Sequence, residues 1–185
     1  WVGKNVSRID PRKLATVAFV VFALVLWMRS QFNPQSPFST ILLPTIVQGV
    51  AMAFFFIPLQ AIVFSGLTPD QMPAASGLSN FVRITAGAMG TSIFTTLWED
   101  RAIMHHAHLA EQINAGSSAA MQTLTQLGAS GLSPEQAAAT INRLIDQQAY
   151  TMAATDLFRL SSFLFLAMIA MVWMTVPRKS AVAAD

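Results

Sequence analysis

A long apolar stretch with an arginine inside it constrains this chain more than any other feature. Residues 74–98 are long enough to cross a bilayer as a helix, for which about 20 apolar residues suffice. The stretch nevertheless contains Asn80 and Arg83, well away from its ends. A charge at bilayer depth is costly and usually faces a bundle interior or a wet cavity. We therefore interpret this stretch as a membrane helix with one functional face.

The polar and small residues of this stretch recur at helical spacing. Steps of three and four residues place them on one stripe of a helix, with larger apolar side chains elsewhere round it. They are Ser76, Asn80, Arg83, Gly87, Thr91 and Thr95. Asn80, Arg83 and Thr91 are therefore candidates for the lining of a substrate cavity. In this interpretation Arg83 pairs with an acid from another helix. The alternative is a structural role, in which Arg83 is bound to helix-end carbonyls or to a partner acid and holds the bundle together.

The composition places the chain among membrane proteins. Hydrophobic residues make up 54% and charged residues 11% of its 185 residues, whereas ordinary soluble domains carry about 25% charged residues. A net charge of +2 without a basic cluster is not typical of a nucleic-acid-binding protein. The chain has no cysteine, no glycine-rich phosphate loop and no nucleophile elbow, so we expect neither an enzyme nor a cofactor.

Four membrane helices are predicted, each as an apolar run bounded by prolines, glycines or charges. Asp10-Pro11 and Ser36-Pro37 have the pattern of a helix start, and Pro177 ends the last run. The expected membrane helices are residues 14–28, 38–64, 74–98 and 157–176.

The second of these helices contains residues that are unusual at bilayer depth. Pro44 and Pro58 each remove a backbone hydrogen bond, so both are predicted to kink the helix. Gln48 and Gln60 flank a run of phenylalanines and are further candidates for a cavity that binds greasy compounds; the alternative is glutamines bonded between helices. Residues predicted to allow close helix packing are Gly49, Gly87 and Gly90.

Residues 99–156 form an acidic segment between the third and fourth membrane helices. Its charged residues are Glu99, Asp100, Arg101, Glu111, Glu135, Arg143, Asp146 and Asp156. We expect the third membrane helix to extend to about Ile113 and Ala115 to Gly131 to be a loose connection. An amphipathic helix should begin at Ser133, lying on the membrane surface or packing on its neighbour.

Three histidines in this segment raise the question of a metal site. His105 and His108 share a helical face, and Glu111 is close in sequence. A metal site needs ligands that converge from several directions and a supporting shell of hydrogen bonds. Because one exposed helix does not supply this, we expect His105, His106 and His108 to be solvated and predict no metal.

The distribution of basic residues predicts the orientation. Four membrane helices place both termini on one side, and Lys and Arg are concentrated there, which marks the cytoplasmic side. We therefore expect residues 1–13 and 177–185 to be cytoplasmic and residues 99–156 to be external.

Several segments resemble the EmrB/QacA-type drug:proton antiporters, which are fourteen-span members of the major facilitator superfamily. The matching segments are residues 54–67, 77–83, 90–109 and the acidic segment that follows. The opening residues also resemble the Gly-x-x-x-Asp-Arg cytoplasmic loop of this superfamily, with Ser7 where an aspartate is common. The resemblance covers almost the whole chain, which begins at Trp1 rather than at a methionine. We therefore expect a fragment from the C-terminal part of such a transporter.

The resemblance implies an all-α membrane protein whose four helices complete a transporter bundle, with a long external helical loop. It implies export of hydrophobic drug-like compounds across the bacterial inner membrane by alternating access, against inward proton flow. It also implies a periplasmic adaptor (a membrane fusion protein) and an outer-membrane channel as partners, with residues 99–156 as a docking surface; the proton-coupling acids are expected in the N-terminal part of the family. Two alternatives remain: an exporter of a siderophore or metabolite, and a non-transporting scaffold that binds a partner through residues 99–156.

Overall fold

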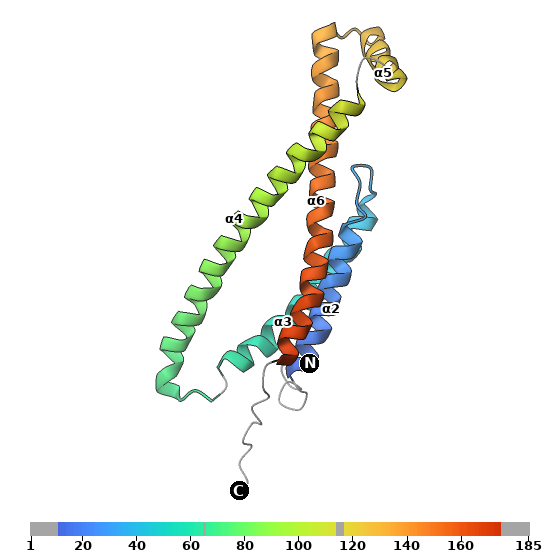
Figure 1. Cartoon of the computed structure of the whole chain (residues 1–185). Coiled ribbons are helices and arrows are strands. Elements are labelled where there is room, and N and C mark those ends of the chain that lie inside the picture. The colour runs from blue at the N-terminus through green and yellow to red at the C-terminus, as the bar shows by residue number, and fades with distance from the viewer. Residues whose placement is uncertain (1–10, 65, 114–116, 175–185) are drawn as a thin grey trace.

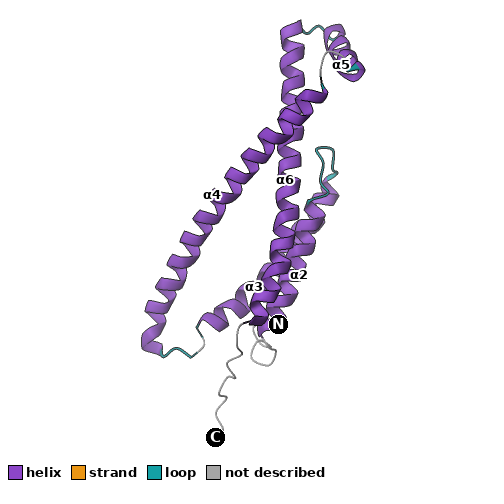
Figure 2. Ribbon diagram, viewed as in Figure 1, coloured by secondary structure: helices purple, strands orange, loops and turns teal. Residues whose placement is uncertain are grey.

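The computed structural model describes residues 11–64, 66–113 and 117–174. These residues form helices joined by short connections, with no strand among them (Figure 2). The helices are α2 (Pro11–Arg29), α3 (Phe38–Val63), the short 3-10 helix η1 (Pro69–Gln71), α4 (Met72–Gln112), α5 (Ser118–Ala129) and α6 (Pro134–Met174). The expectation of an all-helical chain is confirmed for this part.

Helix α6 is the element on which the others assemble (Figure 1). Its C-terminal half lies beside α2, and its N-terminal half is crossed by α4 and touched by α5. Helix α3 packs on α2. With 41 residues each, α4 and α6 are about 60 Å long at 1.5 Å per residue, roughly twice the thickness of a bilayer's hydrocarbon core.

The contacts among α2, α3 and α6 are built mainly from aromatic rings. The Phe22 ring stacks on the Phe165 ring with centroids 5.2 Å apart, and the Phe19 ring lies 5.6 Å from that of Phe55. Aromatic rings bury large areas and favour offset or edge contacts of this kind. A buried hydrogen bond from Ser162 Oγ to the Ala23 carbonyl (2.8 Å) adds a polar contact between α6 and α2. This part of the molecule therefore has a packed interior.

Helices α4 and α6 meet through small side chains. Every fourth residue of α6 is buried along one face, at Ile145, Ala149, Ala153 and Leu157, and Ala102 is buried on α4. Alanine at helical spacing allows two helix backbones to approach closely. The contact lies in the part of the molecule that we call the arm: residues 98–112 of α4, α5, and residues 134–156 of α6.

The other half of α4, residues 72–97, diverges from the remaining helices (Figure 1). Every side chain from Asn80 to Leu97 is exposed, including large apolar ones such as Phe81 and Ile93, at 66% and 60%. We call this the free half of α4. Among the described residues it has apolar surface that no neighbour covers.

The predicted helix starts agree with the structure. Helix α6 begins after Ser133, whose backbone N–H donates to Gln136 Oε1 (2.9 Å) while its Oγ accepts from the Gln136 N–H (3.3 Å). This reciprocal pair is a capping box. Helix α4 reaches Gln112, as expected for an extension to about Ile113. The residues before Pro11, including Asp10, and those after Met174 lie outside the described residues.

The prediction of a loose connection from Ala115 to Gly131 is wrong, because residues 118–129 form α5. Ser117 caps its start by accepting a hydrogen bond from the Ala120 N–H. Its end is a Schellman motif, with hydrogen bonds from Leu132 N–H to the Leu127 carbonyl and from Gly131 N–H to the Gly128 carbonyl. Gly131 has φ +89°, which glycine adopts without strain. Local capping therefore outweighs a composition rich in glycine and serine.

The amphipathic helix expected at Ser133 and the membrane helix expected at residues 157–176 are one helix in the structure. No proline or glycine separates them, so nothing in the sequence interrupts the backbone hydrogen bonds. On length and composition, two of the described helices could cross a membrane: α6 and, over Phe38–Phe56, α3. The four-span count is a proposal considered below.

Helix α3 continues through both of its prolines. Pro44 is fully buried, and next to it Thr45 Oγ donates to the Ile41 carbonyl (2.9 Å) and accepts from Arg29 of α2 (3.3 Å). The side chain of Pro58 lies outside the described set. Kinks at these two positions stay a prediction.

Candidate functional site

The candidate cavity residues of α4 lie on its free half. Arg83 Nη2 donates to Asn80 Oδ1 at 2.7 Å, one helical turn away. Thr91 Oγ donates to the Gly87 carbonyl of its own helix at 2.9 Å. The guanidinium is thus oriented by an amide, and its other N–H groups point away from this bond. A fixed cation beside a polar amide can bind an anionic or carbonyl group of a ligand.

The polar stripe of the free half continues in line into the arm. An α-helix repeats its angular positions after five turns, or about 18 residues. Asn80, Arg83, Gly87 and Thr91 therefore share the directions of Trp98, Arg101, His105 and Leu109, in that order. Because these four arm residues lie against α6 or the hollow beside it, the stripe faces the side of α4 on which the other helices lie.

Within the arm, two residues of α4 converge on one carboxylate of α6. Asp156 Oδ2 accepts from Arg101 Nη1 at 3.0 Å and lies 2.9 Å from His105 Nε2. The His105 side chain is 13% exposed and that of Asp156 is 25% exposed. Partial burial raises the pKa of Asp156, but the hydrogen bonds and charges of His105 and Arg101 outweigh this, and the pKa is held below its ordinary value. We call these three residues the anchor.

Two further contacts join the same helices. His106 Nε2 lies 3.4 Å from Asp146 Oδ1 and 3.3 Å from Asn142 Oδ1. Trp98 Nε1 donates to the Tyr150 carbonyl at 3.1 Å, and the two rings meet edge to face. The expectation that all three histidines are solvated is therefore wrong for two of them. His105 and His106 contact α6 because residues 142–156 of that helix lie against this part of α4. His108 is exposed. No group of three or more His, Cys, Asp or Glu side chains in the described ranges could hold a metal.

The other predicted cavity residues are not brought to this stripe. Gln48 is half-buried and Gln60 exposed on α3, which packs on α2, whereas α4 packs on α6. The structure therefore does not gather the five candidates into one cavity.

The three packing glycines have no close neighbours among the described residues. No heavy atom of another element lies within 4 Å of where a Cβ would stand at Gly49, Gly87 or Gly90. Two of these glycines are on the free half of α4, which no described helix covers. Close packing at these positions is not present here and stays a prediction for contacts with other parts of a transporter.

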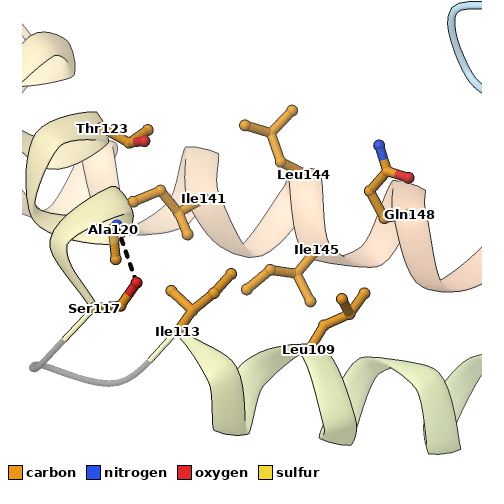
Figure 3. A pocket seen from close by; sticks show the side chains of 9 residues that line it. All are labelled: Leu109, Ile113, Ser117, Ala120, Thr123, Ile141, Leu144, Ile145 and Gln148. Atoms are coloured by element: carbon orange, nitrogen blue, oxygen red, sulfur yellow. Dashed lines mark hydrogen bonds between the residues drawn. The ribbon is translucent and has the colours of Figure 1, made fainter.

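Sequence reasoning missed an apolar hollow in the arm (Figure 3). Its volume is about 220 Å³, and its lining comes from the end of α4, from α5 with its N-cap, and from α6. Its largest apolar members are Leu109, Ile113, Ile141, Leu144 and Ile145. A second hollow, of about 290 Å³, shares three of these residues and extends to Leu124 of α5. The two hollows show that α5 fills the space beside α4 and α6 incompletely. The spacing of Ile141 and Ile145 predicts an apolar face on α6. The neighbouring helix α5 was not predicted, because residues 115–131 were expected to be a loose connection.

Known proteins match the chain over nearly its whole length. It is 38% identical over 177 residues to the multidrug export protein EmrB of Escherichia coli K12, and 35% identical over 176 residues to the fatty acid resistance protein FarB of Neisseria gonorrhoeae. The colistin resistance protein EmrB of Acinetobacter baumannii is 24% identical over 160 residues. The first two matches cover 95% of this chain and 35% of each relative; the third covers 84% and 31%.

No family model matches the chain, and no solved structure matches it significantly. The chain spans about a third of the length of the first relatives it matches. These relatives confirm the resemblance drawn from the sequence: over 95% of its length the chain is similar to the C-terminal portion of EmrB-type transporters of the major facilitator superfamily.

Proposed function

We propose that the chain is the C-terminal portion of a proton-driven multidrug exporter that works by alternating access in the bacterial inner membrane. The observation that carries this proposal is the Arg83–Asn80 pair on the free half of α4, in a chain 38% identical to a multidrug export protein. Ionisable side chains are rare at bilayer depth, and those that occur there commonly mark the path of a substrate or an ion. In this proposal the stripe faces a wet path through which greasy compounds leave.

The proposed topology has four membrane helices. They are residues 14–28, 38–64, 74–98 and 157–176, with both ends of the chain cytoplasmic and the arm external. The lengths of α3 and α6 support two of these helices. For the helix at 74–98, the support is its exposed apolar surface together with a polar stripe on one face. Rocking of this bundle against a second one would open the path to either side in turn.

The test is the efflux of a fluorescent dye from cells that carry the intact gene and lack their own pumps. We expect Arg83→Ala to lower the efflux rate at least tenfold with the protein still present in the membrane. Ser92→Ala is the matched control, because Ser92 lies two and a half turns from Arg83 and thus on the opposite face of α4. Normal efflux by Arg83→Ala would remove Arg83 from the path. Efflux by the parent that continues after collapse of the proton gradient would exclude proton coupling.

A narrower cargo is the second candidate, and one relative favours it. FarB is named for resistance to fatty acids, which are anionic amphiphiles that a guanidinium such as that of Arg83 could bind. Competition between the dye and fatty acids, siderophores and cationic drugs separates the two candidates. Inhibition by one class alone would support the narrower cargo, and inhibition by several unrelated classes would support a multidrug exporter.

The arm is the proposed docking surface for a periplasmic adaptor, through which an outer-membrane channel would be reached. It extends beyond the end of α2 (Figure 1) and contains the acidic segment of the sequence. Deletion of residues 115–131 removes α5 and both hollows. We expect this deletion to abolish co-purification of the adaptor; unchanged co-purification would exclude α5 from docking.

The scaffold alternative makes the opposite prediction for the stripe. If the protein only binds a partner through residues 99–156, then Asn80, Arg83 and Thr91 can all be replaced by leucine with every phenotype of the intact gene retained. If the protein exports drugs, the triple variant loses efflux and keeps adaptor binding.

A further inference from the structure

We propose that Asp156 is a positioning residue, which fixes the rotation of α4 about its own axis and thereby directs the Asn80–Arg83 stripe toward the substrate path. That the stripe lines a substrate path rests on the proposed function. That Asp156 fixes the rotation of α4 rests only on the geometry of the anchor and does not depend on transport.

The anchor defines one rotation because two donors from successive turns of α4 meet one oxygen atom. Arg101 Nη1 and His105 Nε2 both lie within 3.0 Å of Asp156 Oδ2. Residues four apart on a helix share a face, so both can reach that oxygen only when this face is turned toward α6. A contact from a single long side chain would tolerate a wider range of angles.

The apolar part of the same interface has little means of holding that rotation. Its buried residues near the anchor are Ala102 on α4 and Ala149, Ala153 and Leu157 on α6. Three of these four are alanines, whose small side chains allow close approach but do not interlock as larger ridges and grooves do. The rotation of α4 about its own axis therefore depends on the polar contacts that residues 98–106 of α4 make with α6. Among these, Asp156 is the residue that two side chains of α4 share.

The angle set in the arm is transmitted to the stripe. Arg83 lies five turns from Arg101, or about 27 Å along a continuous helix. Because helix backbone hydrogen bonds resist twisting, a rotation at Arg101 becomes a similar rotation at Arg83. A tilt of α4 of about 10° about the anchor would in addition move Arg83 by about 5 Å, given that separation. Asp156 thus acts on the stripe through Arg101 and His105 without touching a ligand.

The experiment measures the direction of α4 in the intact transporter. The described chain has no cysteine, so single reporters are introduced by Thr91→Cys on the stripe and Met89→Cys on the far face, with any cysteine elsewhere in the intact protein replaced. The rate of labelling by a water-soluble maleimide is compared at the two positions. We expect the parent to label faster at residue 91. Asp156→Asn should lower the ratio of the two rates at least threefold and raise the KM for dye more than it lowers the maximal rate.

Asp100→Asn is the matched control. It removes a carboxylate next to Arg101 in sequence, but Asp100 is exposed and lies about 100° round α4 from Arg101, so we expect the labelling ratio to stay unchanged. Reversal of the pair, Arg101→Asp with Asp156→Arg, restores the contact between these two positions but not the contact of His105, so the ratio should recover in part. If Asp156→Asn does not reach the membrane, Arg101→Gln serves instead, because it keeps the Asp156–His105 contact and should lower the ratio less.

An unchanged ratio in both Asp156→Asn and Arg101→Gln would overturn the proposal. So would a lowered ratio that the reversed pair fails to restore, because the effect of Asp156 would then not pass through Arg101. If the parent exports no dye but shows the expected labelling pattern, the export proposal fails and the positioning role of Asp156 stands.

Discussion

Helices α4 and α6 have the same length, 41 residues each, yet only α6 packs against other helices in both of its halves. Its N-terminal half packs on α4 through Ala149 and Ala153, and its C-terminal half packs on α2 through Ser162 and Phe165. Helix α4 is held in the arm alone, and its other half is exposed. The contrast shows that α6 connects the two packing regions of this chain, whereas the free half of α4 has a polar and an apolar surface that no described helix covers.

The largest difference should appear when the same substitution is made in the two regions. Phe22→Ala empties a site between the Phe55 and Phe165 rings and should cost about 3–5 kcal/mol in the free energy of unfolding. Phe81→Ala, on the free half of α4 at 66% exposure, should cost less than about 1 kcal/mol. Unfolding of the purified protein in detergent measures both. Equal losses of unfolding free energy in the two variants would show that Phe81 is buried in the intact protein. The difference in packing between α6 and the free half of α4 would then not hold there.

Overpacking of the α4–α6 contact should come next in size. Ala153 is completely buried, so Ala153→Phe must push the two helices apart, at a cost of about 1–3 kcal/mol. The expected signs are a lower melting temperature and loss of the labelling difference between residues 91 and 89. Met152→Phe, at the adjacent and exposed position, is the control and should leave both unchanged. A tolerated Ala153→Phe would mean that the arm is less closely packed than described.

A smaller loss is expected on the other face of α6. Ser162→Ala removes the 2.8 Å hydrogen bond to the Ala23 carbonyl and should cost about 0.5–1 kcal/mol, as single polar contacts between membrane helices usually do. The labelling ratio on α4 should not change, because Ser162 joins α6 to α2. A change in that ratio would show that the two packing regions are coupled.

The smallest effect concerns pH. The pKa of Asp156 is lowered in the folded protein, so its ionised form stabilises the fold above the ordinary carboxyl pKa and this contribution is lost as pH falls through the lowered value. The melting temperature of the parent should therefore fall below about pH 4 more steeply than that of Asp156→Asn, by about 1 °C or less for a partly exposed pair. A parallel decline in the two proteins would show that Asp156 gains nothing from Arg101 and His105.

Much of the fold follows from local sequence signals. Capping patterns at Thr68-Pro69 and Ser133-Pro134 mark the starts of η1, which leads into α4, and of α6, and the relatives confirm the family resemblance. The continuity of α6 was also readable, because no proline or glycine occurs between Pro134 and Pro177. Helix α5 was not predicted because a high glycine and serine content favours a loop. The places of these residues favour a helix, since Ser117 is at the N-cap and Gly131 directly follows the C-cap.

The contacts between helices were not predictable in the same way. Arg101 and Asp156 are 55 residues apart, and their pairing depends on the relative rotation and register of two long helices, which one sequence does not specify. For Arg83 the expectation was an acid from another helix, and the structure shows a hydrogen bond to Asn80 of the same helix. Asn80 lies one turn from Arg83 in the sequence, but an amide does not neutralise a charge, so its hydrogen bond to Arg83 was not predicted.

The unbroken backbone of α6 has a consequence for how the protein sits in its lipid. In the proposed topology no turn marks the place where this helix leaves the bilayer, so its depth would depend on the chemistry of the side chains near Asp156 and Arg159. Ionic groups at the lipid surface would then help to set the height of the arm, and exchanging one of them with a leucine a turn away should move the arm as a unit.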